Sequence, residues 1–126
     1  MRGAEGNPGV SELDKALAVL EARRVEEETD RQRRRAAACA FLKGFYNADV
    51  APSRKLKERG IASSFDGSRL LLERPEEGHF SEGLAIVVGE QGEIDVGGKS
   101  LGRHQPGDEA AKKSELIAEI ISHFSL

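Results

Sequence analysis

The feature that most constrains this chain is a long stretch that contains neither glycine nor proline. Neither residue occurs between Gly9 and Gly44, and in a helix interior they cost about 1 and 3 kcal/mol relative to alanine. Ser11 stands three positions before Asp14, a spacing that resembles a capping box. We therefore predict a helix over residues 10–47. The glycines and proline of residues 1–9 predict a flexible arm before it.

The beginning of this predicted helix has a narrow apolar seam. Four apolar residues recur at spacings of three, four and three, which places them on one side of a helix: Val10, Leu13, Leu17 and Leu20. Residues 21–35 then contain only two apolar side chains, an alanine and a valine. Because this charged stretch separates the leucines from the rest of the chain, we expect another chain to cover them. A second copy related by a two-fold axis is the simplest partner.

The charged stretch has its own means of remaining helical. Opposite charges recur four positions apart, for example in Arg23 with Glu27 and Asp30 with Arg34. Each such pair contributes about 0.2–0.5 kcal/mol. The seam spans two heptads, fewer than a typical coiled coil. These features predict a solvated, coiled-coil-like helix.

The end of the helix has a wider apolar face, suited to packing on a core: Ala38, Phe41, Leu42, Phe45 and Tyr46. Pro52 then interrupts the chain, and a short helix is predicted at residues 53–59, ended by Gly60. Later, Asp108 opens a last helix. Its apolar stripe predicts packing on a sheet: Ala110, Leu116, Ile117, Ile120, Ile121 and Phe124.

Between the short helix and the last helix, the pattern changes to that of β-strands. Two apolar stretches, 61–65 and 68–73, flank Asp66-Gly67, a dipeptide typical of a two-residue type I′ hairpin turn. A continuous apolar run at 84–88 predicts a buried strand, and the alternation at 93–96 predicts a half-exposed one. Residues 97–107 are rich in glycine and are interpreted as a link.

This order of elements defines an α+β fold. We predict a long N-terminal helix, a short helix, a four-stranded antiparallel sheet made of β-hairpins, and a C-terminal helix packed on one face. The length of 126 residues favours one domain. The prediction is therefore a single α+β domain over residues 10–126, from which helix 10–47 projects.

No motif in the sequence indicates an enzyme. Gly97-Gly98-Lys99-Ser100 resembles the end of a phosphate-binding loop, but Glu93 stands where that motif requires its first glycine. None of the three histidines has a second histidine or a cysteine at metal-ligand spacing. We accordingly expect no catalytic residues, no cofactor and no metal.

The remaining composition favours a cytoplasmic protein. The only cysteine, Cys39, lies among alanines and is interpreted as a small buried hydrophobic residue. One cysteine allows no disulfide within the chain, as in a reducing compartment. No stretch approaches the ~20 apolar residues of a membrane span, so no membrane association is expected.

Two functions follow from these patterns as hypotheses. The first is a non-enzymatic protein–protein interaction module, which forms a homodimer or binds another protein through helix 10–35, with Leu13, Leu17 and Leu20 as contacts. The alternative is association with nucleic acid through the basic clusters 31–35 and 54–59. Its phosphate contacts would be Arg33, Arg34, Arg35, Arg54, Lys55 and Lys57. The absence of tryptophan weighs against stacking on single strands.

Overall fold

A computed structural model describes residues 11–75 and 81–126 of the chain. The predicted flexible arm, residues 1–9, lies outside the described residues, as does Val10 at the start of the predicted helix and seam. The chain divides into two compact units, residues 1–31 and 32–126. The first unit contains the leucine seam, and the second contains the sheet and the core.

The predicted long helix is present as α1 (Glu12–Phe45), followed by one π-helical turn, η1 (Tyr46–Val50). The capping box is also confirmed. The Asp14 backbone N–H donates to Ser11 Oγ at 3.0 Å, and the Ser11 N–H donates back to Asp14 Oδ2 at 3.4 Å. The short helix, α2 (Arg54–Glu58), has Ser53 as its N-cap, whose Oγ accepts from Leu56 N at 3.3 Å.

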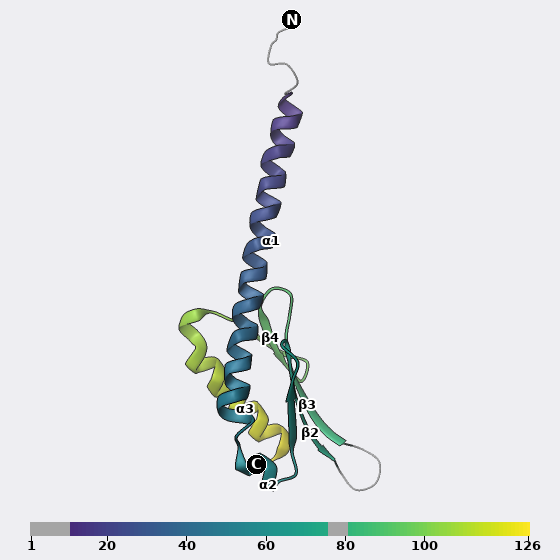
Figure 1. Cartoon of the computed structure of the whole chain (residues 1–126), viewed down its shortest axis with the longest axis vertical. Helices are drawn as coiled ribbons and strands as arrows, with labels where there is room; N and C mark the ends of the chain where they lie inside the picture. The colour runs from purple at the N-terminus through teal and green to yellow at the C-terminus, as the bar shows by residue number, and fades with distance from the viewer. Residues whose placement is uncertain (1–10, 76–80) are drawn as a thin grey trace, which may run out of the picture. The chain divides into compact units, whose positions relative to one another are not determined.

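Five antiparallel strands form one sheet in sequence order, and Figure 1 shows the neighbouring strands β2, β3 and β4 within it. The strands are β1 (Ala62–Phe65), β2 (Arg69–Pro75), β3 (Ser81–Val88), β4 (Glu93–Val96) and β5 (Lys99–Arg103). Leu70 lies opposite Ile86, and Ile86 opposite Val96. The inward side chains of three adjacent strands therefore form one continuous apolar surface.

The prediction of four strands was wrong by one, because the segment interpreted as a link contains β5. Gly97 and Gly98 have φ angles of +56° and +88°, which form a tight two-residue turn after β4. The chain then returns with Lys99 opposite Val96. The strand has no apolar alternation, and Gly102, at φ +87°, interrupts it. For this reason no periodic pattern in residues 99–103 indicated a strand.

The first hairpin is confirmed, but its turn is displaced by one residue. Phe65 lies opposite Leu70, so the two central residues are Gly67 and Ser68. Gly67 has a φ of +106°, whereas Asp66 and Ser68 have none in the positive range. A type I′ turn requires two positive φ angles and a type II′ turn only one. Asp66 instead accepts the backbone N–H groups of Ser68 and Arg69 through its carboxylate.

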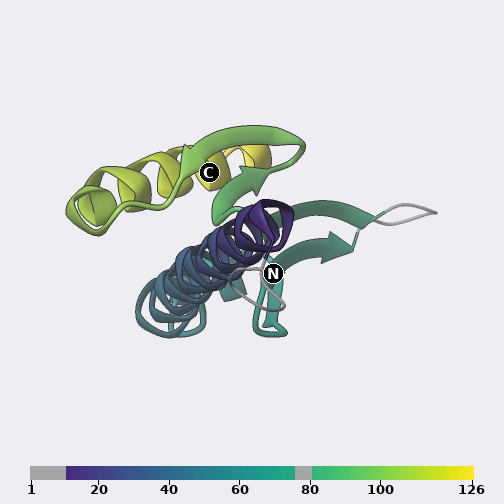
Figure 2. The ribbon, with the colours of Figure 1, turned by 90° about the horizontal axis from the view of Figure 1, so that it is seen from above.

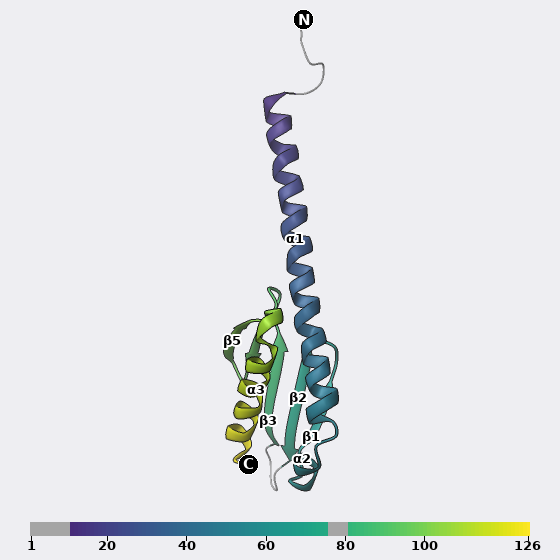
Figure 3. The ribbon, with the colours of Figure 1, turned by 90° about the vertical axis from the view of Figure 1, so that its left-hand side faces the viewer.

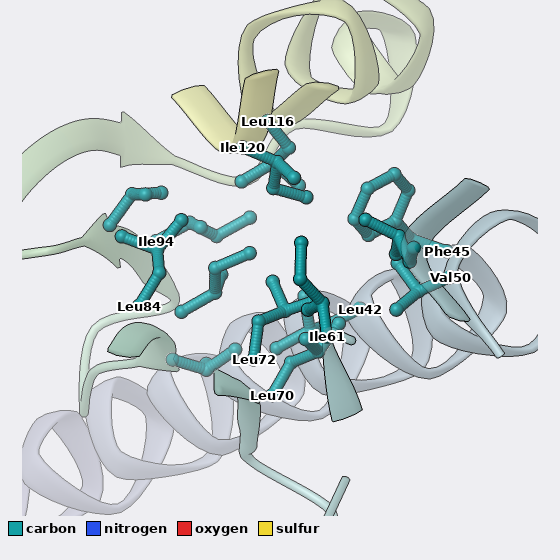
Figure 4. Packing of buried hydrophobic residues seen from close by; sticks show 14 of the residues in the cluster. Leu42, Phe45, Val50, Ile61, Leu70, Leu72, Leu84, Ile94, Leu116 and Ile120 are labelled. Carbon is teal, nitrogen blue, oxygen red and sulfur yellow. The ribbon is translucent and has the colours of Figure 1, made fainter. Parts of the chain in front are cut away.

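Within residues 32–126, both long helical segments cover the same face of the sheet, as predicted. Figures 2 and 3 show α3 (Glu109–Phe124) and the last part of α1 on that face. The core lies between these layers, and Figure 4 shows the labelled side chains converging there. It draws on Ala38, Leu42 and Phe45 of α1, Leu116, Ile120 and Phe124 of α3, and seven strand residues: Leu70, Leu72, Leu84, Ile86, Val88, Ile94 and Val96.

Some predicted core positions lie at its edge. Ile117 and Ile121 of α3 are exposed, so the buried stripe of this helix is narrower than predicted. Phe41 and Tyr46 are partly buried and pack against the core. Cys39 is half-buried at the same edge. The core thus uses the centre of each predicted apolar face and leaves its margins accessible.

Candidate functional site

The first unit presents the leucine seam on a capped helix. Leu13, Leu17 and Leu20 are 67, 44 and 39% exposed, and their spacing of four and three places them on one side of α1. The capping box fixes where this helix begins. The seam is therefore an ordered row of apolar side chains that face solvent in the single chain.

The charged stretch after the seam includes the ion pair Arg31–Glu28, one helical turn apart. The acidic residues of this stretch precede most of its basic ones: Glu26, Glu27, Glu28 and Asp30 stand before Arg31, Arg33, Arg34 and Arg35. Exposed pairs of this kind contribute little stability each. The two signs are separated along the helix: most of the acidic side chains precede most of the basic ones, so the two halves of the stretch carry opposite charge.

The second unit contains a groove between α1 and α3, with a volume of about 610 Å³. One wall is formed by α1 and η1 and contains several small residues: Ala37, Ala40 and Gly44 of α1 and Ala48 of η1, with Phe41 among them. The opposite wall comes from Pro106, Glu109, Ala110 and Lys113. Because the side chains of this wall are small, the groove leaves space beside the helix backbone. The spacing of the alanines is a sequence signal for the α1 wall, but nothing local indicates the groove itself.

Polar contacts hold both ends of this groove. Lys113 Nζ lies 2.7 Å from the buried Asp49 Oδ2 and joins α3 to the residues that follow α1. His104 Nε2 lies 2.8 Å from Glu109 Oε2, and its ring centroid is 5.3 Å from that of Phe41. The His104 side chain is only 4% exposed. Lys113–Asp49 and the His104–Phe41 ring contact join the two walls, whereas His104–Glu109 is a local pair on one side; sequence reasoning assigned no role to His104.

The structure places the two basic clusters apart. Within the second unit, α1 continues for ten residues after Arg35, about 15 Å of axial rise. The five-residue helix α2 comes only after that, at the far end of α1 in Figure 3, and spans about 7.5 Å itself. Arg34 is half-buried and donates to Gln91 Oε1 at 3.2 Å. Arg33, Arg35, Arg54, Lys55 and Lys57 are exposed.

Neither a metal cluster nor a membrane-spanning helix occurs in the described part of the chain. In residues 11–75 and 81–126, no three histidine, cysteine or acidic side chains gather to hold a metal ion. Among the helices that the structure describes, none combines the length and apolar character needed to cross a bilayer.

Comparison with known proteins adds no relative: no family model, no curated protein and no solved structure matches this chain.

Proposed function

We propose that this protein is a non-enzymatic protein–protein interaction module that forms homodimers through the leucine seam of α1. The observation that supports this best is the exposure of Leu13, Leu17 and Leu20 in one row. Single exposed leucines are ordinary, whereas an aligned apolar row on an ordered helix is typical of an interaction surface. Burying these side chains against a second copy stabilises a dimer in proportion to the apolar area removed from water.

The mass of the protein in solution tests this proposal. Light scattering at high micromolar concentration is expected to give twice the chain mass of 13.7 kDa. Leu17→Asp is expected to shift the mass towards that of one chain, because it places a carboxylate in the seam. Val19→Asp is the matched control, since Val19 is 59% exposed but lies off the seam. A wild type that stays monomeric at this concentration contradicts the proposal.

Nucleic-acid binding is the second candidate, supported by the exposure of Arg33, Arg35, Arg54, Lys55 and Lys57. Two separated clusters support it less well than one patch, because each alone contacts few phosphates. If it is correct, duplex DNA binds at 50 mM salt and dissociates steeply as salt rises. Replacing Arg33, Arg34 and Arg35 by alanine must then reduce the salt dependence. No retention of the wild type on DNA at 50 mM salt excludes this candidate.

A further inference from the structure

We infer that the two copies of the homodimer pair their α1 helices in parallel, with Arg23 of each copy beside Glu28 of the other. The inference rests on the proposed function, because it concerns the same leucine seam. It adds the direction of the two helices and names the charged residues that select it. All the residues involved lie within residues 1–31, the first compact unit.

The spacing of the seam determines which side chains flank it. Leu13, Leu17 and Leu20 fall at the contact positions d, a and d of successive heptads, because their spacing is four and then three. The three leucines are exposed, and Figure 1 shows this part of α1 as an unbroken helix. In a helix pair, the side chains at positions e and g lie along the two edges of such a contact. Assigning the leucines therefore also assigns the edges.

The two edges of the seam differ in charge. The e positions are Asp14, Glu21 and Glu28, and the g positions are Ala16 and Arg23. The side chains at these positions are exposed. At about 100° per residue, Glu28 and Arg23 lie roughly 50° and 90° to opposite sides of the centre of the seam. One edge therefore carries only carboxylates, whereas the other carries an arginine.

A parallel pair brings these unlike edges together. Each g side chain then meets the e side chain of the next heptad in the other copy, which places Arg23 beside Glu28 twice in a symmetric dimer. The preceding pair, Ala16 with Glu21, contains one charge and no repulsion. Glu28 also pairs with Arg31 of its own chain, and an ionised carboxylate can accept from two partners. The parallel dimer therefore gains two ion pairs between the helices.

An antiparallel pair brings the two acidic edges together, because e positions then face e positions. In either register that packs leucine on leucine, Asp14 lies near Asp14 or Glu21 of the other copy. Carboxylate beside carboxylate opposes association. The leucines are the same in both directions, so the charges at the edges select the parallel orientation.

The next contact position after the seam is an arginine. Arg24 occupies position a, so its two copies lie side by side in the parallel dimer. The stem of an arginine can extend along the helix and keep its charge in water. A polar residue at a single a position fixes register at a cost in stability. The pairing therefore extends over residues 13–28, and the dimer needs high protein concentration to form.

Disulfide cross-linking tests the direction of the helices. The parent is Cys39→Ala, into which Leu13→Cys or Leu20→Cys is introduced singly. In a parallel pair each position faces its own copy, so each variant alone is expected to form a disulfide-linked homodimer on mild oxidation at high micromolar concentration. In an antiparallel pair at most one of the two positions can face its own copy. Val19→Cys is the control, because Val19 is exposed but lies off the seam.

The outcomes separate this inference from the proposed function. Cross-linking of both seam variants at about ten times the yield of Val19→Cys supports the parallel pair. If the parent is dimeric but only one seam variant links, or neither does, the parallel direction is wrong and self-association stands. A dimeric parent whose Val19→Cys control links as well as the seam variants also overturns the inference. A monomeric parent overturns both proposals.

Charge exchange provides a second test without cysteine. Arg23→Glu places two carboxylates beside each other twice in the parallel dimer, and Glu28→Arg does the same with two guanidinium groups. Each variant alone is expected to raise the dimer Kd by about tenfold. In an equimolar mixture one chain carries both carboxylates and the other both guanidinium groups, so dimerisation is expected to return. Glu26→Arg is the control of equal charge change, because position 26 lies away from the seam, and it is expected to leave the Kd within about twofold of the wild type.

The mixture distinguishes the two directions. In an antiparallel pair Arg23 faces Ala16 of the other copy, so mixing the two variants restores nothing. A mixture that associates no better than either variant alone, while the wild type is dimeric, overturns the inference. An effect of Glu26→Arg as large as that of Glu28→Arg also overturns it, because net charge would then explain the loss.

Discussion

A side chain at Gly92 would collide with the backbone of Arg34. A Cβ atom on Gly92 would lie 2.9 Å from the Arg34 carbonyl oxygen, and the residue has a φ of +80°. Two separate reasons therefore favour glycine at this position: the left-handed backbone conformation and the close approach of the Arg34 backbone. This contact fixes the β3–β4 turn against α1 near the start of the groove-forming segment, where Arg34 also donates to Gln91.

Gly92→Ala is expected to lower the free energy of unfolding by about 3 kcal/mol. About 1–2 kcal/mol comes from the left-handed backbone, and the collision with Arg34 adds the rest. Chemical denaturation measures the change. Gly60→Ala is the matched control, because Gly60 has a φ of +75° but a Cβ atom there would meet nothing within 4 Å. Equal losses for the two variants would show that the contact with Arg34 contributes nothing.

Leu42→Ala is expected to lower the free energy of unfolding by about 2–5 kcal/mol. Leu42 is fully buried in the core of the second unit, and its truncation leaves a cavity there. Leu20→Ala removes the same atoms from an exposed site and is expected to change stability by less than about 0.5 kcal/mol at concentrations where the chain is monomeric. Denaturation at low protein concentration measures both. Similar losses for the two variants would mean that Leu20 is covered within its own chain.

Ser11→Ala is expected to destabilise the beginning of α1 by about 1 kcal/mol. The substitution removes the Oγ that accepts from Asp14 N, so the first turn frays. Faster hydrogen exchange at the amides of residues 14–18 measures this effect. Ser11→Asn retains an N-cap acceptor and is expected to exchange at the wild-type rate. Unchanged exchange in Ser11→Ala would show that the cap does not stabilise this end.

Lys112→Met is expected to destabilise the protein by about 1–2 kcal/mol. Lys112 is buried, and its ammonium donates to the Leu101 carbonyl oxygen of β5. Methionine retains much of the stem but leaves that carbonyl without its donor. Lys113→Met, at the neighbouring half-exposed ion pair, is expected to cost less than about 1 kcal/mol. Hydrogen exchange should increase at β5 in Lys112→Met alone. An equal increase in both variants would contradict the role of Lys112.

The sequence alone determined the features that depend on neighbours along the chain. The run from Val10 to Lys43 lacks helix breakers, and Ser11 with Asp14 forms a local cap, so α1 and its start were predictable. The position of Pro52 and the spacing of apolar residues in 61–96 likewise predicted α2 and four strands. The leucine seam and both basic clusters were visible in the same way, because helical spacing is a local property.

Only the tertiary structure decided what depends on residues far apart in sequence. The fifth strand exists because the turn at Gly97-Gly98 returns residues 99–103 to β4, where backbone pairing substitutes for an apolar pattern. The groove brings together residues distant in sequence, where Lys113 of α3 pairs with Asp49 and the His104 ring lies against Phe41 of α1. The separation of the basic clusters depends on how far α1 continues before α2 begins. Local chemistry selects helices, caps and turns, whereas a surface formed by two elements depends on how the core packs them together.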